Sequence, residues 1–418
     1  MHSHEQLIAE RQRLLGAGYR LFYQNPLHPV RGEGVWLYDA DGRRYLDAYN
    51  NVVSVGHCHP RVVDAIAEQS AQLNTHTRYL HEAIIDYADE LLASFPAPLR
   101  NMTLTCSGSE ANDLALRVAR EITGGSVAIV TRWAYHGVTC AIAELSPSLG
   151  TGCSANVRLI DAPDSYRSPG TWLNSLRHTL IELQKEGLRP SALLVDTIFS
   201  SDGIFSPLAG EMQQAVDLIH NAGGLFIADE VQAGFARTGA HFWGFEGLGV
   251  IPDLVTMGKP MGNGHPVAGV VGRPDIFTTF GQRQRYFNTF GGNPVSCKAA
   301  HAVLHVIRDE HLQENAQIQG AALRDGLKKL ASQHANIGDV RGKGLFTGVE
   351  LVISQQSREP ATELATAVVN LMREEGVLIS ATGPASNILK IRPPLILASE
   401  HVELLTQTLD RVLTTLRM

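Results

Sequence analysis

The sequence predicts an α/β fold built around a mainly parallel sheet. Strand-like and helix-like stretches alternate through the middle of the chain. The strand-like stretches are short runs rich in Val, Ile, Leu and Phe, bounded by Gly or Pro, which is typical of strands buried on both faces. The 418 residues are enough for a large domain and a smaller one. We therefore expect helices on both faces of the sheet, with a second domain beside it.

The large domain is expected to contain five strands of this kind. They are Val127–Thr131, Leu193–Phe199, Leu225–Asp229, Leu254–Met257 and Gly269–Gly272. Helical patterns lie at Glu110–Ile122 and Glu211–Ala222, and the second ends in a glycine pair that favours a helix stop. A further helix is expected near Arg61–Leu73, before the first strand.

The last third of the chain changes character and predicts a smaller α+β domain. Helical patterns near Val303–Leu330 and Pro360–Glu375 bracket short strands at Gly348–Val352 and Leu389–Ile391. Near the other end of the chain, the stretch Val35–Asp47 has an Asp-Gly turn at its centre, which predicts a hairpin.

Composition and charge restrict the partners. The net charge is −7 and the pI is about 6.2, which argues against nonspecific nucleic-acid binding. No apolar run is long enough to span a bilayer, and the polar N-terminus does not resemble a signal peptide. The five cysteines include no C-x-x-C pair, so a reduced, cytoplasmic setting is expected. His57, Cys58 and His59 are adjacent and would point to alternate faces, so no metal site is predicted.

Lys259 and Asp229 are the pair that points most directly to chemistry. Asp229 ends one expected strand, and Lys259 follows the next one within a glycine-rich turn. A lysine amine can form an imine with the aldehyde of pyridoxal 5'-phosphate (PLP), and an aspartate keeps the pyridine nitrogen protonated so that the ring accepts electrons. Most single lysines are solvated surface residues. The pair nevertheless predicts PLP as cofactor, with Lys259 as its anchor and base.

Six motifs in order along the chain resemble the class III, or ω-type, PLP-dependent aminotransferases. They are GHCHP at 56–60, CSGSEAND at 106–113, AYHG at 134–137, FIADEVQAGFARTG at 226–239, TMGKPMGNGHP at 256–266 and FNTFGGNP at 287–294. The resemblance implies the PLP-dependent transferase fold, fold type I. It also implies that residues 1–50 join residues 301–418 in the small domain, with residues 51–300 forming the large PLP-binding domain.

The segment Ser107-Gly108-Ser109 precedes an expected helix, with Ser109 as the candidate N-cap. Free N–H groups at a helix start bind anions, and Gly108 permits close approach. Taken alone, the segment is better explained as simple helix capping. The family resemblance implies instead that it holds the cofactor phosphate.

The resemblance also assigns the residues around the cofactor ring. Tyr135, which is followed by His136, would stack on one face, Val231 would pack on the other, and Gln232 would reach the ring hydroxyl. Thr289 would contact the phosphate from the neighbouring subunit. These assignments imply a homodimer, with a tetramer as the alternative assembly.

Two departures from the family bear on the substrate. Many members carry a glutamate where this chain has Asp196, and an arginine that grips the keto-acid carboxylate where this chain has Lys390. Lysine keeps the charge but lacks the bidentate fork. Arg392 lies two residues on and would share a strand face with Lys390. The two cations are therefore candidates for binding an anionic substrate group, and a surface charge pair on an edge strand is the alternative.

Other stretches resemble the ethanolamine-phosphate phospho-lyase branch of the same family. They are YNNV at 49–52, NTHTRYLHE at 74–82 and GDVRGKGLF at 338–346, together with GHCHP and the lysine motif. Within the NTHTRYLHE stretch, Arg78 is a candidate for binding the leaving phosphate. The segment 193–206 departs from this branch.

Three functions remain open at this point. An aminotransferase moving an amino group from a small amine or ω-amino acid to a 2-oxo acid is the leading hypothesis. A phospho-lyase on ethanolamine phosphate is the second, and a non-catalytic PLP-binding module is the third. Turnover without an amino acceptor would distinguish the first two.

Overall fold

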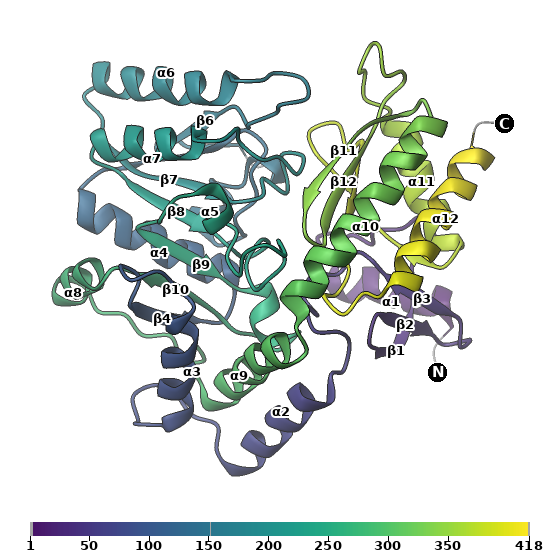
Figure 1. The fold of residues 1–418 in the computed structure, drawn as a ribbon. Helices are drawn as coiled ribbons and strands as arrows, with labels where there is room; N and C mark the ends of the chain where they lie inside the picture. The colour runs from purple at the N-terminus through teal and green to yellow at the C-terminus, as the bar shows by residue number, and fades with distance from the viewer. Residues whose placement is uncertain (1–2, 151, 417–418) are drawn as a thin grey trace.

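The structure is a computed structural model that describes residues 3–150 and 152–416. Within these residues the strands form one seven-stranded sheet and two four-stranded sheets. The large sheet lies in one half of the molecule, and the two smaller sheets lie together in the other half, beside the helices of the C-terminal part (Figure 1).

The seven-stranded sheet is mainly parallel, as the sequence predicts. Its strands, in spatial order, are β4 (Asn101–Thr105), β10 (Ala268–Gly272), β9 (Leu254–Met257), β8 (Leu225–Asp229), β7 (Pro190–Asp196), β5 (Val127–Thr131) and β6 (Val157–Ile160). The strands from β9 to β6 pair in parallel, and β10 runs antiparallel to both of its neighbours.

The predicted strand Leu193–Phe199 is displaced in the structure. Strand β7 ends at Asp196, because the Asp196 carboxylate accepts hydrogen bonds from the N–H groups of Ile198 and Ser200 and turns the chain. Phe199 then adopts a left-handed backbone with φ of 49°. A run of apolar residues therefore continues past the end of the strand, which the apolar pattern alone cannot reveal.

Two buried apolar clusters cover opposite faces of the sheet. Along β5, Val127 and Ile129 belong to one cluster, whereas Val130 belongs to the other, as the alternation of a strand requires. One cluster packs α4 (Gly108–Thr123) and α8 (Pro274–Arg283) on the sheet. The other includes residues of α3 (Glu82–Ala93), α6 (Thr171–Lys185), α7 (Glu211–Asn221) and α9 (Pro294–Asp309). Helices on both faces are therefore confirmed.

A second sheet forms the core of the C-terminal part. Its order is β11 (Ile337–Lys343), β12 (Phe346–Leu351), β15 (Ile388–Ile391) and β14 (Ser380–Thr382). Helices α10 (Leu312–Gln333) and α11 (Thr362–Glu374) pack on this sheet, and α12 (Ser399–Thr415) packs against these two helices. The single helical pattern predicted near 303–330 is wrong in one respect. It is divided between α9 and α10, because His311 lies in the left-handed region with φ of 53° and breaks the helix.

The N-terminal residues contribute to the same half of the molecule. After α1 (His4–Leu15), the predicted hairpin forms from β2 (Trp36–Asp39) and β3 (Arg44–Asp47), with β1 (Pro29–Glu33) beside β2. Strand β3 also pairs in parallel with β13 (Val377–Leu378). This pairing supports the proposed small domain of residues 1–50 and 301–418, although the boundary at residue 300 falls inside α9.

The remaining elements complete the chain as the structure describes it. They are α2 (Pro60–Gln72), α5 (Cys140–Ala143), η1 (Pro147–Leu149), η2 (Glu246–Leu248) and η3 (Lys259–Gly262). Helix α2 lies where the sequence predicts a helix. Among all of the described helices, none combines the length and apolar character that a membrane crossing requires.

Candidate active site

A cavity of about 210 Å³ lies where several parallel strands end. It is lined by Ser107, Gly108, Ser109, Asn112, Tyr135, His136, Gly137, Asp196, Asp229, Val231, Gln232 and Lys259. Strands β7 and β8 end in lining residues, and β9 leads into Lys259. This is the edge of an open α/β sheet where ligands commonly bind. The fold brings together every predicted cofactor-binding residue except Thr289.

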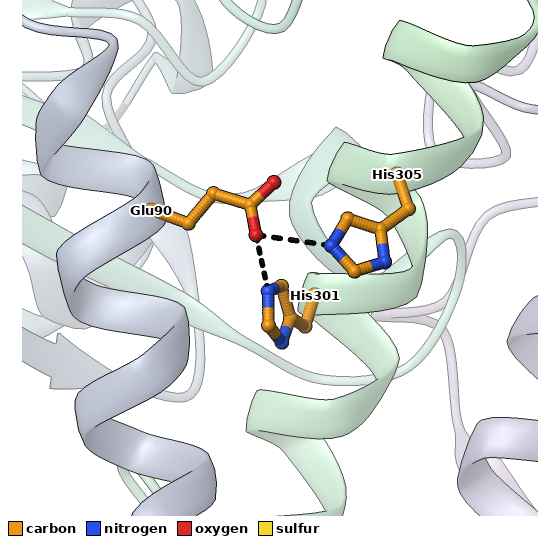
Figure 2. Close-up of side chains that lie close together, drawn as sticks. All are labelled: Glu90, His301 and His305. Atoms are coloured by element: carbon orange, nitrogen blue, oxygen red, sulfur yellow. Dashed lines mark hydrogen bonds and ion pairs between the residues drawn. The ribbon is translucent and has the colours of Figure 1, made fainter.

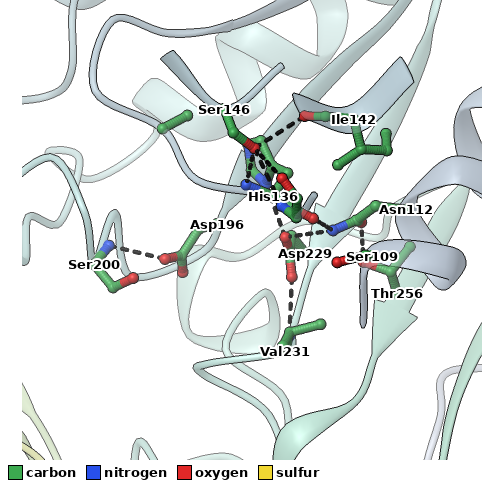
Figure 3. Close-up of polar contacts among 12 residues, drawn as sticks. Ser109, Asn112, His136, Ile142, Ser146, Asp196, Ser200, Asp229, Val231 and Thr256 are labelled. Carbon is green, nitrogen blue, oxygen red and sulfur yellow. Dashed lines mark hydrogen bonds and ion pairs between the residues drawn. The ribbon is translucent and has the colours of Figure 1, made fainter. Parts of the chain in front are cut away.

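Asp229 lines the cavity and is held by three hydrogen bonds (Figure 3). We call Asp229 and the residues that bond to it the floor of the cavity. Its Oδ2 atom lies 2.8 Å from Nδ1 of His136 and accepts a 2.8 Å hydrogen bond from Nδ2 of Asn112. Its Oδ1 atom accepts a 3.0 Å hydrogen bond from the N–H of Val231. The carboxylate is buried, so these partners fix both its position and the direction of its negative charge.

Asn112 is a site residue that the sequence analysis missed. Its Oδ1 atom accepts a 2.6 Å hydrogen bond from the Thr256 hydroxyl, so its amide group must point toward Asp229. It also donates to the backbone oxygen of His136 at 2.7 Å. The available signal was an asparagine on the otherwise apolar buried face of α4.

Lys259 begins the short helix η3 directly after Gly258. Burial lowers the pKa of the Lys259 amine below its usual range, and the nearby negative charge of Asp229 opposes that shift. A lowered pKa leaves more of the amine uncharged near neutral pH. The uncharged amine is the form that attacks an aldehyde or accepts a proton.

The start of α4 forms one wall of the cavity, but its cap differs from the prediction. Ser107 is the N-cap, with an extended backbone and a side chain that accepts a 3.3 Å hydrogen bond from the N–H of Glu110. Ser109, the predicted cap, is already helical, and its Oγ accepts from the N–H of Val138 at 3.1 Å. The Ser107 and Glu110 spacing is the capping signature that identifies the correct residue.

Close packing around this wall explains two glycines. A Cβ atom on Gly108 would lie 2.9 Å from Cγ2 of Val231, and one on Gly137 would lie 2.4 Å from Oγ of Ser109. Gly137 also has a φ of 136°, which L side chains rarely adopt. The two glycines therefore let the α4 start, the Val231 side chain and the Tyr135-His136-Gly137 turn approach one another.

Tyr135 and Val231 both line the cavity, as the ring-stacking assignment requires. Tyr135 is partly exposed, and burial followed by the charge of Asp229 raises the pKa of its hydroxyl. Tyr135 is therefore neutral at physiological pH and offers an uncharged aromatic face.

Lys390 and Arg392 are buried, so the alternative prediction of a surface charge pair on an edge strand is wrong. Strand β15, which carries Lys390, lies between β12 and β14, and both side chains are less than a tenth exposed. Burial lowers the pKa of Lys390 well below its usual range, and the positive charge of Arg392 adds to the shift. Burial also raises the pKa of Asp196, with a contribution from Asp229.

Arg392 is connected to the cavity by a hydrogen bond to Gln232, which is one of the lining residues. Its Nη1 atom donates to Oε1 of Gln232 at 3.0 Å and to Oδ1 of Asn51 at 3.3 Å, and its guanidinium lies 5.1 Å from the ring centroid of Tyr49. Asn51 also donates to Oε1 of Gln232. Asn51 and Tyr49 belong to the quoted YNNV stretch, but the sequence analysis assigned them no role.

Arg78 and Thr289 lie outside the cavity, on exposed segments. The Arg78 guanidinium lies 3.9 Å from the ring centroid of Phe287, so the two segments are in contact. Large exposed apolar side chains on residues 73–85 and 286–290 are Leu73, Tyr79, Leu80, Ile85, Tyr286, Phe287 and Phe290. Thr289 therefore lies within an exposed apolar surface of the single chain.

Comparison with known proteins identifies the family. The aminotransferase class-III family matches residues 22–413, nearly the whole chain. The chain belongs to this family. The chain shares 41% identity with a fruit-fly (Drosophila melanogaster) protein named alanine–glyoxylate aminotransferase 2-like, covering 96% of this chain and 85% of that protein. It shares 36% identity with ethanolamine-phosphate phospho-lyase homolog 1 of Caenorhabditis elegans, covering 99% and 94%.

Solved structures of this class III family include both kinds of enzyme. A phospholyase from Arthrobacter, in complex with phosphoethanolamine, matches with a TM-score of 0.95 and 42% identity over 98% of this chain and 99% of that one. An ω-transaminase from Thermomicrobium roseum matches with a TM-score of 0.88 and 28% identity over 99% of each chain. The PLP-dependent transferase fold is therefore confirmed, and class III enzymes are PLP-dependent.

The residues of this class III chain fit PLP. The cavity combines a half-buried lysine, a carboxylate with a fixed orientation and the start of a helix whose N–H groups suit a phosphate. Position 108 at the helix start requires glycine, because a Cβ atom there would lie 2.9 Å from Cγ2 of Val231. When bound, PLP supplies an electron-accepting ring and an aldehyde for the lysine amine.

Proposed function

We propose that the chain is a PLP-dependent phospho-lyase that acts on phosphoethanolamine or a similar amino-alcohol phosphate. The observation that carries this proposal is the 42% identity with the Arthrobacter phospholyase, compared with 28% for the Thermomicrobium transaminase, at similar coverage. The sequence motifs favoured transamination first, and we propose the opposite order. The proposal also agrees with the phospho-lyase-like stretches at 49–52, 74–82 and 338–346.

The buried cations support an anionic substrate. Lys390 and Arg392 lie behind the cavity wall, and no described ion pair joins either to a carboxylate. Arg392 also has a buried Nε atom that lacks a hydrogen-bond partner among the described residues. Since an uncompensated buried charge is costly, an anionic ligand nearby would stabilise both side chains in their charged form.

Each site residue then has a defined part in the reaction. Lys259 anchors the cofactor and, once released, removes a proton from the carbon that bears the substrate amine. Asp229, oriented by Asn112 and His136, holds a proton on the pyridine nitrogen. The start of α4 at residues 107–109 would hold the cofactor phosphate, Tyr135 and Val231 would pack against the ring, and Gln232 would reach the ring hydroxyl.

The substrate phosphate leaves from the neighbouring carbon when that carbon–oxygen bond breaks. One water molecule is consumed, and each substrate yields one phosphate, one ammonia and one aldehyde. The proposed partners of the substrate phosphate are two buried cations, Arg392 and Lys390. Arg78, on an exposed segment, is a third candidate. Asp196 would offer them a counter-charge when the substrate lacks an anionic group.

A class III aminotransferase, using a small amine and a 2-oxo acid, is the second candidate. The 41% identity with a protein named as an aminotransferase favours it. The non-catalytic PLP-binding module is the third hypothesis, and an absence of turnover with every substrate pair would favour it.

The proposed active form is a homodimer in which Thr289 of each chain completes the phosphate site of its partner. Two observations support this assembly. Thr289 is exposed and lies outside the cavity of its own chain, and exposed Phe287 and Phe290 flank it. An apolar surface of this kind is typical of a subunit interface. The cytoplasmic location stays a prediction, and some relatives are named as mitochondrial proteins.

The decisive experiment compares turnover with and without an amino acceptor. Purified holoenzyme is mixed with phosphoethanolamine, and phosphate and ammonia are measured with and without pyruvate or 2-oxoglutarate. A phospho-lyase releases both products in equal amounts over many cycles without an acceptor. An aminotransferase requires the acceptor and stops after half a reaction, an outcome that would overturn the proposal.

A further inference from the structure

Glu90, His301 and His305 converge at a point between two helices, away from the cavity (Figure 2). His301 and His305 are one turn apart on α9 and therefore share a face, and Glu90 lies opposite them on α3. Oε2 of Glu90 lies 2.5 Å from Nε2 of His301 and 3.0 Å from Nε2 of His305. None of the three residues lines the cavity.

The ligand atoms suit a transition metal. One carboxylate oxygen and two imidazole nitrogens all lie within 4.8 Å of one another. Around a tetrahedral zinc ion with bonds of about 2.0–2.1 Å, ligand atoms lie about 3.4 Å apart. Small rotations of these side chains, each at least 16% exposed, would open the space for an ion. Magnesium and calcium prefer sites made of oxygen ligands alone.

The surroundings orient the carboxylate for this role. Oε1 of Glu90 accepts a 2.8 Å hydrogen bond from Nη1 of Arg308, which leaves Oε2 directed at the two imidazoles. Hydrogen bonds to the second oxygen commonly position a metal-binding carboxylate. Without an ion, the two histidines share a single carboxylate oxygen, so a divalent cation would relieve their crowding.

We propose that Glu90, His301 and His305 form a zinc-class metal site that clamps α3 to α9. The three residues supply three ligands, and water or another exogenous ligand takes the fourth position. The metal would act on stability and not on the reaction. Helix α9 begins at Pro294, directly after the segment that carries Thr289, so the clamp would hold the base of that segment.

Zinc binding to the tag-free, chelator-treated holoenzyme tests the proposal. Isothermal titration with Zn²⁺ should give one site per chain. This site should be absent after His305→Gln or Glu90→Gln, because either change removes one of the three ligands. His178→Gln, a change in an exposed histidine on α6, should bind as the parent does, and His4→Gln controls for binding at the N-terminus. Cobalt absorption in the visible range would report tetrahedral coordination in the parent alone.

Thermal unfolding supplies an independent readout. Zinc at about 100 times its Kd should raise the Tm of the parent by about 3 °C, and it should leave the Tm of His305→Gln unchanged. Turnover should be equal in the parent and in His305→Gln, so the result does not depend on the proposed reaction. Absence of a site in the parent, or undiminished zinc binding in both site variants, would show that the cluster is only an ion-pair network.

Discussion

The cavity floor and the exposed loop around Thr289 differ in whether a single chain surrounds the residue with bonding partners. On the floor, Asp229 has partners from α4, from the turn after β5 and from Val231, two residues further along the chain. Around Thr289, the single chain offers an exposed segment with exposed apolar side chains. The partners of Asp229 thus come from one chain, whereas the proposed contact of Thr289 with the cofactor phosphate requires a second chain.

This difference has a physical basis. A carboxylate can keep its charge in a buried site only when fixed donors surround it, and the ends of packed strands and helices supply donors in fixed positions. A loop contact to a cofactor phosphate needs no buried scaffold of its own, so it can come from a neighbouring subunit. Variants on the floor should therefore affect the chemical step, and variants on the loops should affect cofactor retention and assembly.

The largest expected effect comes from the floor. Lys259→Ala should lower kcat by about 10⁴-fold or more, because it removes both the cofactor anchor and the base. Borohydride treatment of the parent should attach the cofactor to the peptide that holds Lys259, which peptide mass spectrometry would detect. Lys343 is the matched control, since burial also lowers its pKa. Label on Lys343, or on any other lysine in place of Lys259, would contradict the assignment.

Asp229→Asn should give the next largest loss, about 10²–10³-fold in kcat, in protein that is still loaded with PLP. The amide cannot hold the positive charge of the protonated ring, and its NH2 group cannot accept the hydrogen bonds that one of the two carboxylate oxygens accepts. Asp253→Asn is the matched control, because Asp253 is also buried and pairs with His220 and Arg273 outside the cavity. That variant should lose stability and keep its rate. Equal rates in the two variants would make Asp229 a structural residue.

Local patterns were sufficient to predict where Asp229 and Lys259 lie in the fold. Apolar runs located β8 and β9, and the family motifs placed Asp229 and Lys259 at their ends. The patterns could not show that Asn112 points at Asp229, because that orientation depends on Thr256, more than a hundred residues away. For the same reason, no spacing in the sequence brings Glu90 to His301. His311 broke a predicted helix, since the left-handed conformation of a single histidine leaves no trace in the apolar pattern.

Substitution of the buried cations Lys390 and Arg392 should have a smaller effect on the rate, limited to anionic substrates. Arg392→Ala should lower kcat/KM for phosphoethanolamine about 30-fold, which corresponds to a loss of about 2 kcal/mol in transition-state stabilisation. This loss is at the lower end of the range for truncating one partner of a buried charged pair. The loss is limited because Lys390 remains. Neutral amines, assayed in the first half-reaction, should be much less affected. Arg324→Ala, which removes a partly buried arginine from α10, is the control. Equal losses for neutral and anionic substrates would assign Arg392 to the fold.

The smallest expected effect lies on the loops and tests whether the site is shared. Thr289→Ala should weaken PLP binding by about 1.5 kcal/mol, or about tenfold, through loss of one hydrogen bond to a charged group. Thr289→Ser should restore the affinity because it keeps the hydroxyl. Sedimentation should show a dimer for all three proteins, since a single exposed hydroxyl contributes little to an interface.

Mixed dimers then decide which chain supplies the hydroxyl. When a Lys259→Ala chain pairs with a Thr289→Ala chain, the one site that retains Lys259 lies in the second chain. If Thr289 acts across the interface, that site receives an intact threonine from its partner and binds PLP with parental affinity. If Thr289 acts within its own chain, the same site lacks the hydroxyl and shows the tenfold weaker affinity. Parental affinity is the result we expect, because Thr289 lies outside the cavity of its own chain.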